Sequence, residues 1–236
     1  MSFSWDQGEK MDKNMNAIQE MRIARTIKAL EANHIHAEYL GDKTAVTPRL
    51  QELMAPLSTC SVGGSQTLFE CGVIDFLRSG DFTFYDRYAQ GLGKEEIRKI
   101  YLAAFDVDYY LASANAVTEH GELYCVDNNS NRVAAMLYGP RKVILIVSTD
   151  KIVPDLAAAV CRVKTAAAPA NAIRLERGTF CTKNGHCMNP ACDPRNLMAL
   201  GAGACQNTVC SNAVVFGNQR EDGRMIVLFV GQSIGY

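Results

Sequence analysis

Two polar loops near the middle of the chain hold most of the side chains that could bind or transform a ligand. The first, NAVTEHG, follows an apolar run over residues 109–113, and the second, DNNSN, follows another over residues 122–126. Glu119 could act as a general base or as a carboxylate nucleophile, and Arg132 could bind a carboxylate or phosphate bidentately. Turn chemistry alone would also explain part of DNNSN, and His120 is either an acid–base group or a solvated loop histidine. The candidates in these loops are Asn115, Thr118, Glu119, Asp127, Asn131 and Arg132.

A glycine turn earlier in the chain could present backbone N–H groups to an anion. Residues 57–62 are typical of a strand, Gly63 and Gly64 of a turn, and Ser65 of the N-cap of a helix that runs to residue 77. Strand, glycine turn and helix is an order that can hold an anion, although a plain tight turn has the same sequence. We therefore predict that an anion binds near Gly63, Gly64, Ser65 and Thr67.

A third group of candidates is a set of cysteines in a segment with little apolar material, residues 178–212. Thiolates bind zinc or iron–sulfur clusters, and four ligands complete either site. The alternative is a set of reduced, partly buried thiols. The sequence predicts that at least three of these sulfurs could share a metal, from Cys181, Cys187, Cys192, Cys205 and Cys210.

The elements that must position these groups alternate between apolar runs and helical patterns, which predicts an α/β fold with a mostly parallel sheet flanked by helices. Strands are expected over residues 37–40, 57–62, 82–85, 109–113, 122–126, 142–147, 213–216 and 225–230, the last two joined across the turn NQREDGR. Helices are expected over 11–34, 44–55, 65–77, 94–106, 132–137 and 154–168. Ligands collect beyond the carboxyl ends of parallel strands. Asn115, Thr118, Glu119, Asn131 and Arg132 are therefore expected to line one crevice with the glycine turn.

The pattern favours a single domain over residues 11–236, after a loose tail over residues 1–10. The first helix carries a stripe that includes Met15, Ile18, Met21 and Leu30 at helical spacing, which is typical of core packing. The cysteine segment is expected to be a small excursion from this domain.

Composition excludes several classes of protein. The net charge is −1, from 24 basic and 25 acidic residues, so nothing favours nucleic-acid binding. The longest apolar runs are far shorter than the ~20 residues of a membrane span. The N-terminal residues lack the apolar core of a signal peptide, and nine cysteines in a chain without one indicate the reducing cytoplasm.

Long segments of the sequence resemble the LUD-domain family of bacterial lactate-utilisation proteins. The resemblance is carried by NAVTEHGEL, by NRVAAMLYGPRKVILIV and by the GGSQTL turn, and it extends over nearly the whole chain. It implies a fold like that of glucosamine-phosphate deaminases, ribose-phosphate isomerases and CoA transferases. It also implies a part in oxidising L-lactate to pyruvate, as a subunit beside iron–sulfur partners. The opening of the cysteine segment, CTKNGHC, matches a cysteine pair of the family, but the sequence departs from the family pattern after Cys187.

Three other functions remain open at this point. A sugar-phosphate isomerase of the same fold would have an aspartate where this chain has Asn115, which is not a proton acceptor at neutral pH. A CoA or acyl transferase would use a glutamate such as Glu119, but NAVTEHG does not match the transferase motif. The last alternative is a ligand-binding or scaffold subunit whose cysteines hold a structural metal.

Overall fold

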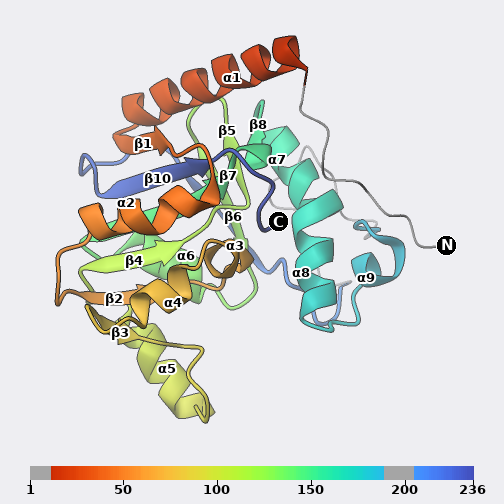
Figure 1. Cartoon of the computed structure of the whole chain (residues 1–236). Helices are drawn as coiled ribbons and strands as arrows, with labels where there is room; N and C mark the ends of the chain where they lie inside the picture. The colour runs from red at the N-terminus through yellow and green to blue at the C-terminus, as the bar shows by residue number, and fades with distance from the viewer. Residues whose placement is uncertain (1–11, 189–204) are drawn as a thin grey trace.

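A wholly parallel sheet forms the centre of the protein in the computed structural model, which describes residues 12–188 and 205–236. In this part of the chain the sheet has six strands in the order β1-β10-β7-β4-β2-β3 (Figure 1). The predicted tail, residues 1–10, and Cys192 lie outside the described residues. The strands are β1 (Ile35–Tyr39), β2 (Thr59–Val62), β3 (Thr83–Tyr85), β4 (Tyr109–Ala112), β7 (Lys142–Ser148) and β10 (Met225–Val230).

Helices cover both faces of this sheet, and the alternation of side chains along its central strands explains why. In β7, Val143, Leu145 and Val147 pack into one core. Ile144 and Ile146 of the same strand pack into another core on the opposite face, as successive side chains of a strand must. The first core is closed by α1 (Lys13–Ala32) and α6 (Asn131–Leu137), and the second by α2 (Val46–Leu53), α3 (Gln66–Glu70) and α4 (Val73–Leu77). The predicted α/β class with a mostly parallel, helix-flanked sheet is confirmed.

A second, smaller sheet corrects two predictions. Its order is β8-β5-β6-β9, formed by β8 (Ile152–Val153), β5 (Ala116–Thr118), β6 (Leu123–Asp127) and β9 (Asn212–Phe216). The run 122–126 was expected in the parallel sheet, but β6 pairs antiparallel with β5 and β9. The expected pairing of the last two strands is also wrong. All residues of β10 are buried, as the middle of a helix-covered sheet requires, whereas β9 exposes part of its side chains at a sheet edge.

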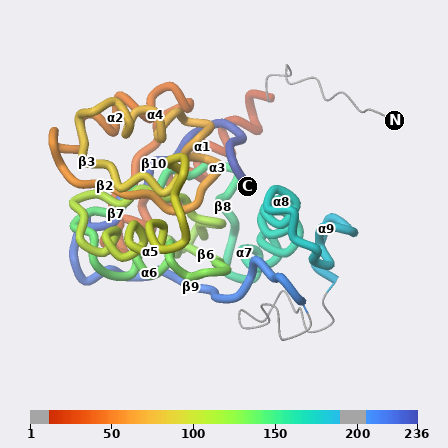
Figure 2. Tube along the Cα trace, turned by 90° about the horizontal axis from the view of Figure 1, so that it is seen from below, coloured from red at the N-terminus to blue at the C-terminus, as the bar shows by residue number. Residues whose placement is uncertain are grey.

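A third layer of helices packs against the small sheet. It contains α7 (Leu156–Arg162), the π-helical turn Val163–Ala167, α8 (Ala168–Arg174) and the short α9 (Phe180–Asn184). Figures 1 and 2 both show α8 and α9 to one side of the main sheet. The expected helix over 154–168 thus continues to residue 174. Pro169 lacks an N–H group and cannot donate to the turn before it, and the π-helical turn Val163–Ala167 lies directly before α8, which contains it.

Two other helices differ from their predicted form. The helix expected over residues 65–77 is broken into α3 and α4 by Gly72, which adopts a left-handed φ of 68°. The apolar stripe of α1 is not core over its first half: Met15, Ile18 and Met21 are all more than half exposed, and burial begins at Ile23. The remaining predicted helix, over 94–106, is α5 (Lys94–Ala103).

No helix in the described part of the chain combines the length and the apolar character that a membrane crossing requires.

Gly121 allows the loop NAVTEHG to pack closely against α1, and we expect Gly121→Ala to be strongly destabilising. Its φ is +82°, and an added Cβ would lie 2.5 Å from the backbone of Ala29. Gly41→Ala is the matched control, because Gly41 has a φ of +68° but nothing within 4 Å of its Cβ position. The left-handed conformation alone costs about 1–2 kcal/mol. Chemical denaturation should show that Gly121→Ala lowers the free energy of unfolding at least about twice as much as Gly41→Ala does. Equal losses would contradict the close packing of Gly121 against α1.

Candidate functional site

A polar pocket lies beyond the carboxyl ends of three adjacent strands of the main sheet. Behind β2 come Gly64, Ser65, Gln66 and Thr67; behind β4 come Ser113, Ala114 and Asn115; behind β7 comes Lys151. Because β2, β4 and β7 are neighbours in the sheet, loops distant in sequence meet at one edge. This is the position at which open α/β sheets bind ligands.

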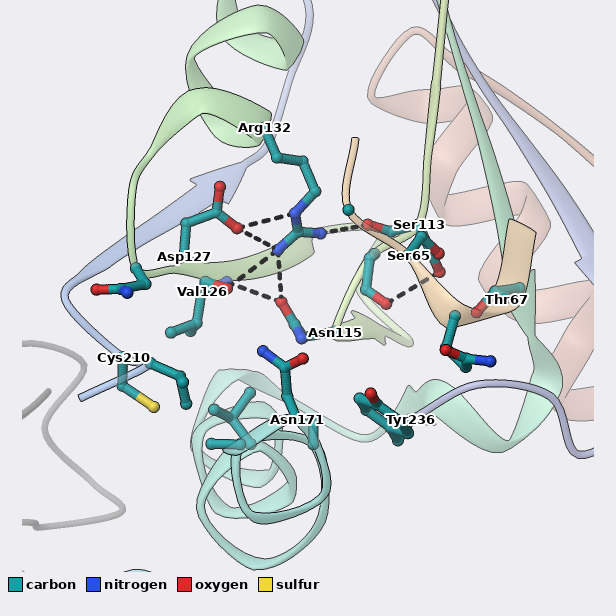
Figure 3. Close-up of a pocket in the computed structure, with 18 of the residues that line it drawn as sticks. Ser65, Thr67, Ser113, Asn115, Val126, Asp127, Arg132, Asn171, Cys210 and Tyr236 are labelled. Atoms are coloured by element: carbon teal, nitrogen blue, oxygen red, sulfur yellow. Dashed lines mark hydrogen bonds and ion pairs between the residues drawn. The ribbon is translucent and has the colours of Figure 1, made fainter. Parts of the chain in front are cut away.

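The small sheet and the third layer of helices form the opposite wall. Asp127 and Asn128 contribute from the end of β6, Arg132 from α6, and Asn171 and Arg174 from α8, with Cys210 and Tyr236 at the rim (Figure 3). The cavity has a volume of about 100 Å³. A water molecule needs only about 10–15 Å³ on this measure, and a ~150 Å³ cavity accepts benzene. The pocket therefore has room for a compound of a few heavy atoms.

Arg132 is buried at the back of the pocket, and its donors are directed to the protein itself. It forms an ion pair with Asp127, 2.7 Å from Nη2 to Oδ1, and it donates to the carbonyl oxygens of Ser113 and Val126. Burial is the largest single influence and lowers the pKa of Arg132, but the charge and hydrogen bond of Asp127, together with Cys125 and Tyr110, raise this pKa above its usual range. The arginine thus holds the ends of β4 and β6 together.

Asn115 turns its amide nitrogen to the cavity. Its Oδ1 accepts hydrogen bonds from Arg132 Nη2 (3.0 Å) and from the backbone N–H of Val126 (2.8 Å). The backbone carbonyl oxygen of Asn115 accepts a further hydrogen bond from Arg162 Nη1. With the oxygen occupied, the NH₂ group remains as a donor, and it faces Asn171 across the pocket (Figure 3).

Lys151 is the most unusual group of the pocket. Its side chain is 1% exposed, and Nζ donates to two hydroxyl oxygens, Thr67 Oγ1 at 3.1 Å and Ser113 Oγ at 3.4 Å. Burial lowers the pKa of Lys151 to about 7, and the positive charges of Arg162 and Arg132 add to this effect. A buried lysine near neutrality, held by hydroxyl groups in a cavity, is typical of a functional site.

The charges around the pocket favour an anion. Among the described residues that line the pocket, Asp127 is the one acidic side chain, and Arg132 already neutralises it. Lys151 and Arg174 then remain as cations, and Arg174 donates to Asn171 Oδ1 at 2.8 Å. A carboxylate or phosphate in the cavity would therefore meet positive charge and amide donors.

The glycine turn contributes to this pocket in part. Gly64, Ser65 and Thr67 line it, but Gly63 does not. The N–H of Gly63 donates to Leu111 O, and a Cβ at Gly63 would lie 2.8 Å from Arg132 Cγ. Gly63 is therefore required for the close packing of Arg132. Anion binding by the turn itself stays a prediction.

The predicted crevice holds Asn115, Arg132 and Asp127 but not the other candidates. Glu119 points to α1, where its carboxylate binds Arg22 at 2.9 Å and Arg25 at 2.8 Å. The hydrogen bond from Arg25, opposed by burial and supported by Arg22, lowers the pKa of Glu119. The placement of Glu119 in the crevice is thus wrong, because β5 turns away into the small sheet. The same applies to Thr118 and Asn131, whose side chains bond locally to Glu122 and Asn129.

Four of the five predicted cysteines surround a second cavity next to the first. Cys181, Cys187, Cys205 and Cys210 all line it. Among the described residues, however, no three histidine, cysteine, aspartate or glutamate side chains are already placed to hold one metal ion. The fifth, Cys192, lies outside the described residues.

Several lining residues were not predicted from the sequence: Lys151, Asn171, Arg174 and Tyr236. Lys151 carries a signal that could have identified it, since it comes three residues after β7, a strand with five successive apolar residues, at its carboxyl end. Asn171, Arg174 and Tyr236 carry no such signal, because they reach the pocket through packing of the third helical layer and the last residues of the chain.

The structure defines an α/β protein with a polar pocket at the carboxyl edge of its parallel sheet. Its sequence matches the LUD domain over residues 23–230, and the chain belongs to the LUD domain family, as predicted. Membership makes it a lactate-utilisation-type protein in general terms. The crystal structure of a DUF162 family protein from Deinococcus radiodurans is similar in fold, with a TM-score of 0.51 and 10% identity, over 91% of this chain and 98% of that chain. No curated protein matches the chain.

Proposed function

We propose that the protein binds a small monocarboxylate of the lactate and pyruvate class in the pocket beyond β2, β4 and β7. The observation that carries this proposal is Lys151, a buried cation whose hydrogen-bond partners are neutral hydroxyls. Burying an ammonium without a counter-ion is costly, and a bound carboxylate would supply the missing charge. The cavity of about 100 Å³ suits a ligand of this size.

Asn115 and Asn171 would orient the bound molecule. The free NH₂ of Asn115 can donate to a carboxylate or hydroxyl oxygen, and Asn171 lies opposite it. Thr67 and Ser113 would keep the Lys151 ammonium aimed at the cavity. Hydrogen bonds to charged groups contribute about 1.5–3 kcal/mol each, so two or three of them would support binding in the micromolar to millimolar range.

We further propose that the protein acts in lactate oxidation beside iron–sulfur partner subunits, which its family resemblance implies. Conversion of lactate to pyruvate removes two electrons and two protons. Lysine, asparagine and arginine side chains can move or hold the protons but cannot accept the electrons. Glu119 does not favour a transferase, because its carboxylate is held by two arginines outside the pocket.

Isothermal titration of the purified chain with L-lactate, pyruvate, acetate and inorganic phosphate tests the ligand class. We expect L-lactate or pyruvate to bind at least about tenfold more tightly than acetate, which lacks the second oxygen-bearing carbon that the asparagines would contact. Asn115→Leu should remove that preference. Tight binding of phosphate with no binding of either monocarboxylate would overturn the proposal.

A further inference from the structure

The second cavity brings together four thiols from two separate stretches of chain. Cys181 belongs to α9, Cys187 follows that helix, and Cys205 and Cys210 precede β9. Lys164, Thr179 and Thr208 complete the polar part of the lining. The remaining described cysteines, Cys60, Cys71, Cys125 and Cys161, lie outside this cavity, so the grouping is not a consequence of cysteine abundance alone.

The size of this cavity decides what it could hold. Its volume is about 20 Å³, little more than the ~10–15 Å³ that one water molecule requires. A single ion fits this space.

The surroundings of the sulfurs suit a thiolate site. Lys164 lines the same cavity and brings a positive charge close to the four sulfurs. Thr179 Oγ1 lies 3.1 Å from Cys181 Sγ, and metal-bound ligands are commonly oriented by such an outer hydrogen bond.

We propose that Cys181, Cys187, Cys205 and Cys210 bind one thiophilic divalent ion, zinc or ferrous iron, as a tetrathiolate. Binding releases four protons to solvent and leaves a complex of charge −2, which the nearby Lys164 ammonium partly offsets. Since no three of these side chains are yet in ligand positions, the cavity must contract around the ion to reach sulfur–metal distances of about 2.3 Å. Cys187 and Cys205, which are only partly buried, are the ligands that move.

The site would also connect to the carboxylate pocket. Cys210, Val209 and Ala168 line both cavities, so ion binding would fix one wall of the ligand pocket. The metal site itself does not depend on the proposed function, and metal content is measured without any carboxylate.

Metal analysis of the full chain, purified without oxygen or chelators, tests the proposal. We expect about one zinc or iron per chain, or uptake of about one cobalt(II) with thiolate-to-metal charge-transfer absorption. Cys210→Ser and Cys181→Ser should lower the metal content at least about tenfold, while the control Cys161→Ser, at an exposed cysteine of α7, should leave it unchanged.

A second measurement uses the native protein, so it tests the proposal even if the cysteine variants fail to fold. In the native protein, cobalt(II) should protect four thiols from alkylation, and mass spectrometry should identify them as the four cysteines of the cavity. Absence of bound metal and of protection would overturn the proposal. Protection of Cys192 in place of one of the four would overturn the ligand set, and multinuclear iron–sulfur absorption would overturn the single ion.

Discussion

Lys151→Met is expected to weaken carboxylate binding by at least about 25-fold. The substitution keeps most of the side-chain volume in a site that is 1% exposed. It removes an ammonium group that forms no ion pair within the described part of the chain and donates to two hydroxyl groups. Loss of one partner of a buried charge pair costs about 2–5 kcal/mol, and each 1.4 kcal/mol is a factor of ten in affinity. Titration calorimetry with L-lactate and pyruvate measures the effect.

Lys142→Met is the matched control. Lys142 begins the same strand, β7, at the opposite edge of the sheet, where its Nζ donates to Gly223 O at 2.7 Å. Its removal should leave ligand affinity unchanged. If both lysine variants bind the carboxylate like the unmodified protein, Lys151 is not its partner and the proposed site is wrong.

The same lysine gives the binding a pH dependence of defined sign. With the pKa of Lys151 lowered to about 7 by burial, the ammonium form that attracts an anion dominates below pH 7. The affinity for the carboxylate should then be nearly independent of pH below about pH 6, and above pH 7 it should fall by up to about tenfold per pH unit. Above pH 7, ligand binding should be accompanied by uptake of a proton. A flat profile between pH 6 and 9 would mean that the ligand does not bind to the ammonium group.

The free energy of unfolding should depend on pH in the opposite direction to the ligand affinity. Between pH about 7 and 10.5, the unfolded chain keeps the Lys151 proton that the native state has lost, so native stability rises with pH across this window. Below pH 7 the buried charge costs a few kcal/mol, at about 1.4 kcal/mol per tenfold change in proton affinity. Lys151→Met should therefore be more stable than the unmodified protein at pH 6, and this difference should shrink as the pH approaches 10.

The parts of the fold that the sequence could predict are those determined by local patterns. The β-branched run of β7 and the apolar run of β10 predict buried parallel strands, because only a strand covered on both faces can be apolar at successive positions. The position of Asn115 at the pocket followed from the assignment of residues 109–113 to the same sheet, since the carboxyl ends of parallel strands share an edge. Arg132 reaches the pocket although β6, the strand before it, belongs to the small sheet.

The errors arise where distant segments determine the outcome. Glu119 is removed from the crevice by Arg22 and Arg25, more than 90 residues away in sequence. The second sheet depends on β6 pairing with β9 across a similar separation, and no local pattern encodes a partner at that range. Lys151 was missed because lysine is usually solvated, and its burial follows from the packing of the layers around it.

Arg132→Met is expected to cause the largest loss of stability among the site variants. The substitution leaves the Asp127 carboxylate without its 2.7 Å partner and the carbonyl oxygens of Ser113 and Val126 without their donor. Breaking a buried ion pair by removing one partner costs about 3–5 kcal/mol. For a domain of this length the melting temperature should fall by on the order of 10 °C, at roughly 2–4 °C per kcal/mol.

Arg141→Met provides the comparison, because Arg141 pairs with Asp108 at 3.4 Å while 84% exposed, and exposed pairs contribute about 1 kcal/mol at most. Thermal unfolding followed by circular dichroism, without ligand, separates two roles for Arg132. If it joins β4 to β6, the loss appears in the free protein and Arg141→Met shows little of it. If instead Arg132→Met melts like Arg141→Met and only carboxylate affinity falls, its donors serve the ligand, and the anion-clamp role first inferred from the sequence replaces the structural one.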